Sequence, residues 1–171
     1  GVVSVSDSAD TTTGGIVGVN HGTLINCQFT GVVTGDSEVG GIVGRNESEG
    51  TIDHSTARAI VTGKSSTGGI AGYNLGAITG CTNVGSINTE YPEASLDTDG
   101  FTAKMVDYIN NKMAAADNDA TNSVTNVATD TGGIAGRSSG MILTSVNTGT
   151  IGYEHVGYNV GGIVGQMEPS S

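Results

Sequence analysis

The chain of 171 residues contains 29 glycines, five tyrosines, two phenylalanines and no tryptophan, so its core must be built from small and β-branched side chains. Six Lys and Arg stand against 17 Asp and Glu, and the net charge of −11 argues against binding to nucleic acid or to anionic lipid, which need clustered positive charge. No apolar run is long enough to span a membrane.

The first element from the amino terminus is Gly1-Val2-Val3-Ser4, whose β-branched residues predict a strand. The sequence Gly-Gly-Ile-(Val/Ala)-Gly then occurs five times, at spacings of 26, 28, 64 and 29 residues. The copies begin at Gly14, Gly40, Gly68, Gly132 and Gly161. A period of this size indicates a repeat architecture.

Each repeat contains three short β-branched segments bounded by Gly or Asn, which lie at 14–20, 22–27 and 31–35 in the first repeat. Their counterparts are 40–46, 68–74 and 132–138 for the first segment, 50–55, 76–81 and 140–145 for the second, and 59–63, 85–88 and 149–152 for the third. Three short strands per repeat predict an all-β fold, a parallel β-helix (solenoid) of about four coils. We expect one solenoid domain over residues 1–171, as a fragment of a longer chain.

Stacked coils place like residues on like residues, about 4.8 Å apart, and stability then comes from neighbouring coils. The predicted core columns are Ile16/Ile42/Ile70/Ile134/Ile163, Leu24/Ile52/Ile78/Ile142 and Val33/Val61/Ile87/Ile151. The apolar column Val17/Val43/Ala71/Ala135/Val164 comes directly after the first, so either the chain bends at the next glycine or this face is covered. We expect the glycines at corners, where positive φ or close approach is needed, and Asn20, Asn46 and Asn74 in positions that tolerate the left-handed region.

These segments resemble the GLUG repeat, on the residues Gly-Gly-Ile-Val-Gly-Val-Asn at 14–20, Gly-Thr-Leu-Ile-Asn-Cys at 22–27 and Gly31-Val32-Val33. The resemblance covers the chain except for about residues 90–130. It implies a large bacterial cell-surface protein, of the kind related to IgA-specific peptidases and adhesin-like proteins. It implies no active-site residues, because the motif is a repeat unit and not a catalytic module.

Residues 90–130 interrupt the repeat, because the spacing of 64 equals one coil plus roughly 36 residues. Phe101, Met105, Tyr108 and Met113 fall at helical spacing and predict a helix over about 100–116. The apolar stripe of this helix either packs on the solenoid or binds a partner.

Cys27 and Cys81 occupy the same column, with Ser55 between them. Two rungs of a parallel stack are about 10 Å apart, which is too far for a disulfide. We therefore expect two reduced, buried thiols with a packing role. A zinc site or a catalytic thiol is disfavoured because the chain has no Cys-x-x-Cys motif.

Three short motifs are similar to known binding or modification sites, but a structural role or chance explains each of them better. Asp97-Thr98-Asp99-Gly100 is similar to part of a calcium loop, but the bidentate Glu is missing, and a turn with a helix cap is favoured. Gly63-Lys64-Ser65 is similar to a phosphate-binding loop without its first glycine or following helix. Asn46-Glu47-Ser48 is a glycosylation sequon that we attribute to chance.

A catalytic site is disfavoured for the remaining polar groups. His21, His54 and His155 lie at different positions of the repeat, and neighbouring residues of Asp53-His54-Ser55 point to opposite faces of a strand. A solvated charged edge is the favoured interpretation of five carboxylates and two arginines: Asp36, Glu38, Glu47, Glu49, Asp53, Arg45 and Arg58. A threonine ladder for an ice-binding face is broken, because Thr23 and Thr51 are replaced by Ala77 and Met141.

The sequence therefore predicts a non-catalytic structural or adhesive repeat module, with no catalytic residues, no cofactor and no metal. The alternative is a glycan-binding or carbohydrate-active β-helix module. The expected partners are flanking repeats of the same chain and a host or cell-surface protein or glycan, without nucleic acid or membrane contact. The expected localisation is extracellular or at the bacterial cell surface.

Overall fold

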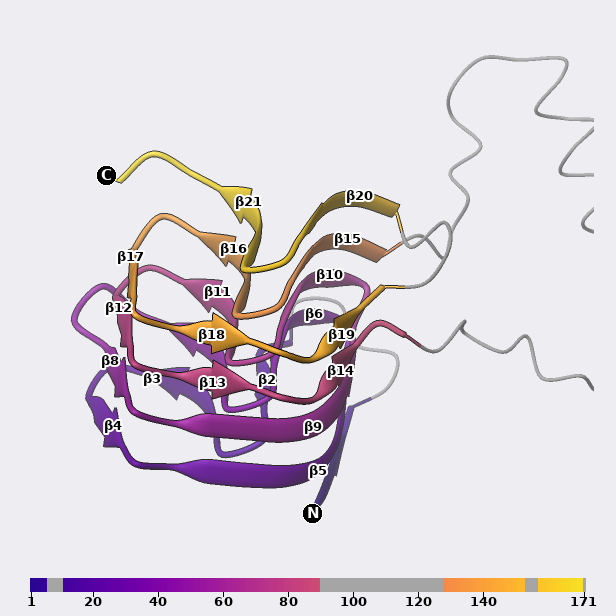
Figure 1. The fold of residues 1–171 in the computed structure, drawn as a ribbon, viewed down its shortest axis with the longest axis horizontal. Helices are drawn as coiled ribbons and strands as arrows, with labels where there is room; N and C mark the ends of the chain where they lie inside the picture. Colours follow the sequence, from indigo (N-terminus) through magenta and orange to yellow (C-terminus); the bar gives the residue numbers. More distant parts are fainter. Residues whose placement is uncertain (6–10, 90–127, 153–156, 171) are drawn as a thin grey trace, which may run out of the picture.

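The computed structural model describes residues 1–5, 11–89, 128–152 and 157–170, and every regular element among them is a β-strand (Figure 1). The strands pair in parallel from one coil to the next and form four sheets, which we name A to D. Within a coil the chain passes through sheets B, C, D and A in that order. The predicted all-β parallel solenoid of about four coils is confirmed.

The bounds of the strands are as follows. Sheet A contains β1 (Val2–Ser4), β5 (Gln28–Thr34), β9 (Thr56–Thr62), β13 (Thr82–Asn83), β14 (Ser86–Ile87), β18 (Val146–Asn147) and β19 (Thr150–Ile151). Sheet B contains β2 (Thr13–Gly14), β6 (Ser37–Gly40), β10 (Ser65–Gly68), β15 (Ala128–Gly132) and β20 (Gly157–Gly161). Sheet C contains β3 (Val17–Asn20), β7 (Val43–Asn46), β11 (Ala71–Asn74), β16 (Ala135–Ser138) and β21 (Val164–Met167). Sheet D contains β4 (Thr23–Ile25), β8 (Thr51–Asp53), β12 (Ala77–Thr79) and β17 (Met141–Leu143).

The prediction of three strands per coil was wrong, because sheet B provides a fourth. The Gly-Gly pair lies between two strands, whereas the sequence pattern placed it at the start of one: Gly40 ends β6, the chain bends at Gly41 and Ile42, and Val43 begins β7. Sheet B is short, and its buried column mixes threonine and valine at Thr13, Val39, Thr67 and Thr131. Because of this mixture, the positions do not form a uniformly apolar column, and the sequence analysis assigned no strand to them.

Like residues stack on like residues throughout the solenoid. Gly68 pairs with Gly40 on one side and with Gly132 on the other. The second of these steps spans 64 residues of sequence, yet β10 and β15 keep the register of their neighbours. The interruption of the repeat therefore leaves the stacking of the coils unchanged.

The predicted core columns are buried in the middle of the stack and exposed at its ends. Ile42, Ile70 and Ile134 have no exposed surface, whereas Ile16 and Ile163, at the two ends of the same column, are 41% and 40% exposed. In the second and third columns, Ile52, Ile78, Val33, Val61 and Ile87 are fully buried, and the end residues Leu24, Ile142 and Ile151 are partly buried. No single coil encloses its own core, so the neighbouring coils do so.

Val43, Ala71 and Ala135, which follow the isoleucine column, are also fully buried. The bend expected at the next glycine was wrong, because Gly44 lies inside β7, whereas the expected covering of this face is present. The bend at Gly41 and Ile42 precedes the strand, so that Ile42 and Val43 both join the core. Sheet B also lies close to sheet C: a Cβ added at Gly72 would meet the backbone of Glu38 and Val39. A glycine at this position lets the two sheets approach.

The paired glycines serve close approach and not left-handed backbone. A Cβ on Gly41 would meet the carbonyl oxygen of Gly69, and a Cβ on Gly69 would meet that of Gly133. Among the described residues, positive φ occurs instead at Gly31 and at three other columns, which are Asn26/His54/Gly80/Thr144, Glu38/Ser66/Asp130/Asn159 and Asn88/Gly152. Asn20, Asn46 and Asn74 do not have positive φ, so the left-handed role expected for them was wrong.

Three connections of variable length lie at the same corner, between a strand of sheet A and the following strand of sheet B. They contain residues 6–10, 90–127 and 153–156, which are outside the described residues. The helix expected over 100–116 and most of the expected 90–130 insertion fall in this range, and β15 begins at Ala128.

Candidate functional site

The predicted charged edge is a set of ion pairs along sheets B and C. Arg45 donates to Glu38 from Nη1 at 2.6 Å and to Glu47 from Nε at 2.8 Å. Burial lowers the pKa of Arg45, but the charges of Glu38 and Glu47 outweigh it and raise the pKa. The guanidinium also lies 5.0 Å from the ring centroid of Tyr73, its neighbour in the next coil.

The same arrangement recurs two coils further along, on the other side of Tyr73. Arg137, which stacks on Tyr73, binds Asp130 at 2.5 Å through Nη2 and approaches Glu168 at 3.4 Å through Nε. Tyr73 donates its hydroxyl to Glu168 at 2.7 Å, and burial together with this bond raises the pKa of Tyr73. We name the outward column Val19/Arg45/Tyr73/Arg137/Gln166 the arginine ladder.

The other carboxylates of the predicted edge also have lysine or histidine partners. Asp36 pairs with Lys64 at 2.9 Å, and Asp53 pairs with the adjacent His54 at 2.8 Å. Glu49 accepts from His21 at 2.9 Å and from Ser48 at 2.9 Å, and these two bonds lower its pKa to about 2. Arg58 does not join this edge, because it lies exposed in β9 of sheet A.

This pairing decides what the edge can do chemically. A glycosidase needs two carboxyl groups facing each other across a substrate, one of them held as an acid. Here all five predicted carboxylates are held by basic side chains, three of them by Arg45 or Lys64 and two of them by His21 or His54. The solvated charged edge predicted from the sequence is therefore a series of stabilising pairs.

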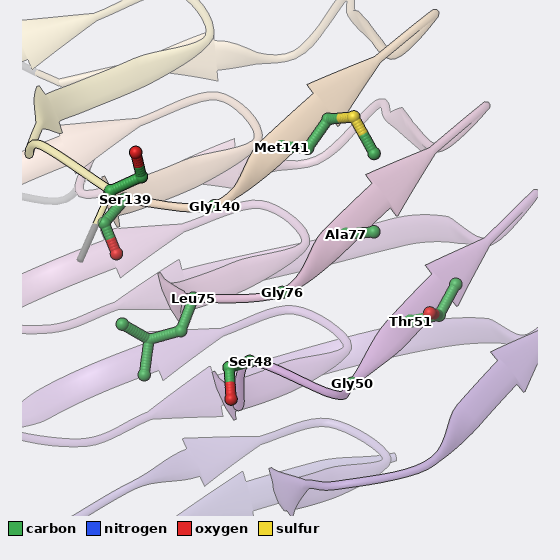
Figure 2. Close-up of a pocket in the computed structure, with 10 residues that line it drawn as sticks. Ser48, Gly50, Thr51, Leu75, Gly76, Ala77, Ser139, Gly140 and Met141 are labelled. Atoms are coloured by element: carbon green, nitrogen blue, oxygen red, sulfur yellow. The ribbon is translucent and has the colours of Figure 1, made fainter.

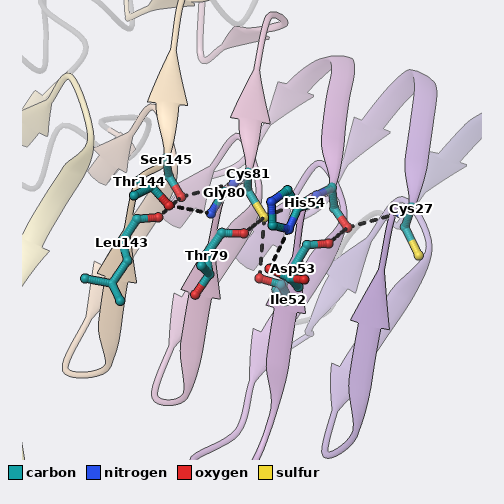
Figure 3. A network of polar contacts seen from close by, with 11 residues as sticks. Cys27, Ile52, Asp53, His54, Thr79, Gly80, Cys81, Leu143, Thr144 and Ser145 are labelled. Carbon is teal, nitrogen blue, oxygen red and sulfur yellow. Dashed lines mark hydrogen bonds and ion pairs between the residues drawn. The ribbon is translucent and has the colours of Figure 1, made fainter.

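The two cysteines lie in one column with serines, as predicted, and both thiols are free (Figure 3). The amide of Cys27 donates to Oγ of Ser55 at 3.1 Å, and the amide of Ser55 donates to Sγ of Cys81 at 3.5 Å. The amide of Cys81 then donates to Oγ of Ser145 at 3.3 Å. Sulfur and oxygen thus play the same part in one continuous ladder.

The two thiols differ in how deeply they are buried. Cys81 has no exposed surface, and burial raises the pKa of its thiol, which keeps it protonated and unreactive. Cys27 is only partly buried, contrary to the prediction, because it lies in the first coil, where no described strand covers β4. The thiol of Cys81 donates to the carbonyl of Thr79 at 3.4 Å, a structural contact.

A shallow hollow of about 540 Å³ crosses the turns between sheets C and D (Figure 2). Ser48, Thr51 and Ser139 provide hydroxyl groups, while Leu75 and Met141 provide apolar surface. Gly50, Gly76 and Gly140 form its floor. Carboxylate, imidazole and thiol groups are absent from this lining, so the described hollow offers a ligand hydroxyl groups without an acid or base beside them.

The remaining predicted motifs have structural roles or fall outside the described residues. Lys64 follows the turn residue Gly63 and leads into β10, where its ion pair with Asp36 occupies the ammonium group. Asn46 of the sequon is fully buried. The calcium-like loop at 97–100 and His155 are not described. Within the described ranges, no group of three or more His, Cys, Asp or Glu could hold a metal ion.

One feature that sequence reasoning missed is a buried amide ladder. Nδ2 of Asn20 donates to Oδ1 of Asn46 at 2.8 Å, and Nδ2 of Asn46 donates to Oδ1 of Asn74 at 2.8 Å. Asn74 continues the ladder to Oγ of Ser138 at 3.2 Å. The sequence signal that could have revealed this ladder is the recurrence of asparagine at one position of the repeat, at Asn20, Asn46 and Asn74.

Residues 35–62 match the model of the GLUG motif, which spans one complete coil from the end of β5 through β9. Comparison with curated proteins and with solved structures gives no match. The matched coil contains one member of each ladder: Arg45 of the arginine ladder, Asn46 of the amide ladder and Ser55 of the cysteine–serine ladder. The chain therefore carries a GLUG repeat folded as one turn of a β-solenoid. None of the described segments is an apolar helix long enough to cross a membrane.

Proposed function

We propose that this chain is a non-catalytic structural module of a secreted or surface-anchored bacterial protein, which spaces or presents other parts of that protein. The observation that supports this most directly is that its polar side chains bind one another, mostly between neighbouring coils. The charged residues pair with one another across coils, and the buried asparagines, serines and cysteines form ladders between coils. These groups hold the stack together, and flanking repeats of the same chain would extend it.

A labelling experiment tests the location and role together. Antibodies raised against the purified chain should label intact cells of the source organism, and brief treatment of intact cells with protease should remove the signal. An antibody against a cytoplasmic protein is the control and should label only permeabilised cells. Labelling that requires permeabilisation would contradict the proposal.

The hollow over the C–D turns favours a second candidate, a glycan- or peptide-binding module. Its hydroxyl groups beside Leu75 and Met141 suit an extended ligand with polar and apolar faces. Ala77→Arg would fill the hollow, whereas Thr79→Arg places the same side chain on the same strand beyond the lining. Binding to a glycan array or to host cells that Ala77→Arg abolishes and Thr79→Arg preserves would establish the second candidate.

Turnover provides a separate test of the non-catalytic role. The chain should release no reducing ends and no unsaturated sugars from a panel of acidic and neutral polysaccharides. Release that is lost in Glu38→Gln or Glu47→Gln would overturn the structural proposal and establish a carbohydrate-active enzyme.

A further inference from the structure

The hollow over the C–D turns follows the stack from one coil to the next, between two ridges of side chains (Figure 2). One ridge consists of the first residues of β8, β12 and β17, which pair in register: Thr51, Ala77 and Met141. The other ridge comes from the turns before these strands: Ser48, Leu75 and Ser139. The hollow is therefore a groove that runs along the stack and repeats once per coil.

The glycine floor between the ridges serves the stacking of the coils. A Cβ on Gly76 would meet the carbonyl oxygen of Gly50, and a Cβ on Gly140 would meet that of Gly76. These two carbonyls already accept the amides of Ala77 and Met141, at 2.9 and 2.8 Å. The groups that can recognise a ligand are therefore the side chains of the two ridges.

The spacing of the coils favours one kind of extended ligand. Neighbouring coils are about 4.8 Å apart, whereas an extended peptide advances by about 3.3 Å per residue and falls out of step with them. One sugar unit of an extended β-1,4-linked glycan advances by nearly the same distance as one coil. Such a glycan can therefore place one sugar against each coil and repeat its contacts along the groove.

The turn ridge also matches the alternation of such a glycan. An extended β-1,4-linked chain turns over at each unit, so the same edge of the chain recurs at every second sugar. Hydroxyl groups recur in the same way on this ridge, where Ser48 and Ser139 lie on either side of Leu75 (Figure 2). Ser48 donates its own proton to Glu49 at 2.9 Å, which leaves its oxygen to accept from a sugar hydroxyl. Leu75 offers the intervening sugar an apolar contact.

The charges around the groove favour a neutral glycan. The lining contains no charged side chain, while Glu47 and Glu49 lie on the same turn as Ser48. Glu49 has a pKa of about 2 and is ionised at neutral pH. Together with the net charge of −11, these carboxylates repel a glycan that carries carboxylate or sulfate groups.

We infer that this groove binds a neutral, extended β-1,4-linked glycan that lies parallel to the stack, with one sugar against each of the coils of Thr51, Ala77 and Met141. The inference rests on the second candidate function, a binding module at the hollow, and it specifies the ligand and its direction. Because the groove is shallow and open, binding of a single chain is weak, and specificity comes from the match between sugar and coil.

A titration of the full chain with oligosaccharides of increasing length tests the match. The probes are oligomers of β-1,4-linked glucose and of β-1,4-linked N-acetylglucosamine, and binding is followed by NMR. In at least one set, affinity should rise up to the trisaccharide and level off beyond it, because three coils line the groove. The α-1,4-linked glucose trisaccharide has the same composition but a curved shape and should bind about tenfold more weakly, as should β-1,4-linked glucuronate.

Two matched variants locate the binding. Leu75→Ala should weaken binding of the β-1,4-linked trisaccharide about fivefold, because it removes the apolar contact at the central coil. Leu143→Ala makes the same change at an exposed position of sheet D outside the lining and should leave the affinity unchanged. Circular dichroism verifies that both variants are folded.

The outcomes separate this inference from the functions proposed above. Equal affinity for the α- and β-linked trisaccharides, or equal affinities of Leu75→Ala and Leu143→Ala, would overturn the inference. An extended peptide that occupies the groove while the glycans do not would also overturn it, but would preserve the second candidate function. Absence of binding by every probe would overturn the inference and leave the structural role as it stands.

Discussion

Asn46 and Asn74 are joined through their side chains in the interior of the solenoid, with Nδ2 of Asn46 donating to Oδ1 of Asn74 at 2.8 Å. Nδ2 of Asn46 also donates to the carbonyl of Gly50 at 3.1 Å, and its Oδ1 accepts from Asn20. Both residues are fully buried. The side-chain amide of Asn46 thus hydrogen-bonds a backbone carbonyl of the turn between sheets C and D, and it also links three coils.

Asn46→Ala should lower the free energy of unfolding by about 2–3 kcal/mol, because it leaves buried partners on two sides without a hydrogen bond. Asn20→Ala is the matched control, since it ends the ladder and breaks the bond on one side only. Urea denaturation followed by circular dichroism measures both. Equal losses for the two variants would show that the ladder contributes nothing beyond each single residue.

Gly69→Ala should destabilise the fold by about 3 kcal/mol, because its Cβ would meet the carbonyl of Gly133 and the side chain of Asn83. Gly162→Ala, in the same column at the open end, should change stability by no more than about 0.5 kcal/mol when the chain is monomeric. Thermal melts at low protein concentration compare the two. A mild Gly69→Ala would contradict the close approach of the coils at this corner.

The thiol column predicts different reactivity at its two cysteines. A thiol reagent should modify Cys27 in the folded protein and Cys81 only after unfolding, and denatured protein should contain two free thiols. Cys81→Ser should cost less than about 1 kcal/mol, because serine already occupies this column at Ser55 and Ser145. Cys81→Val should cost more, about 1–3 kcal/mol, because the buried amide of Ser55 loses its acceptor.

The pair of His21 and Glu49 predicts a shifted titration. The folded-state pKa of Glu49 is about 2, below its ordinary value of 4.5, so the pair's stabilising effect is present above pH 4.5 and disappears as pH falls towards 2. His21→Ala should raise the pKa of Glu49 towards 4.5, and Ser48→Ala should raise it less, because the histidine bond is the larger cause. NMR of the side-chain carboxyl measures this. An unchanged titration in His21→Ala would contradict the pairing.

Much of this fold follows from the sequence because a solenoid stacks equivalent residues. The spacing of the Gly-Gly-Ile copies predicted the coils, and one column of them correctly placed Ile42 and Ile70 in the core. The same alignment put Cys27, Ser55 and Cys81 in one ladder, with the two cysteines two coils apart. In each case a local pattern repeats in space as it repeats in sequence.

The features that the sequence did not predict depend on angles within a coil. Sheet B was missed because its direction relative to sheet C is set by the bend at Gly41 and Ile42, and a bend has no period. The pairing of Arg45 with Glu38 was missed for the same reason, since the two residues face each other only after the chain turns between them. The asparagines were misassigned because their hydrogen bonds run along the stack, between coils.

The corner between sheets A and B has a consequence for how such a chain can be altered. Asn88 closes it from within, accepting from the amide of Gly63 at 2.9 Å and donating to Thr131 at 3.0 Å, while β10 and β15 remain in register across it. The stacking does not depend on the number of residues joined there. A foreign peptide added to the connection between β14 and β15 should therefore leave the coils in register, so this corner is a place at which a peptide can be grafted.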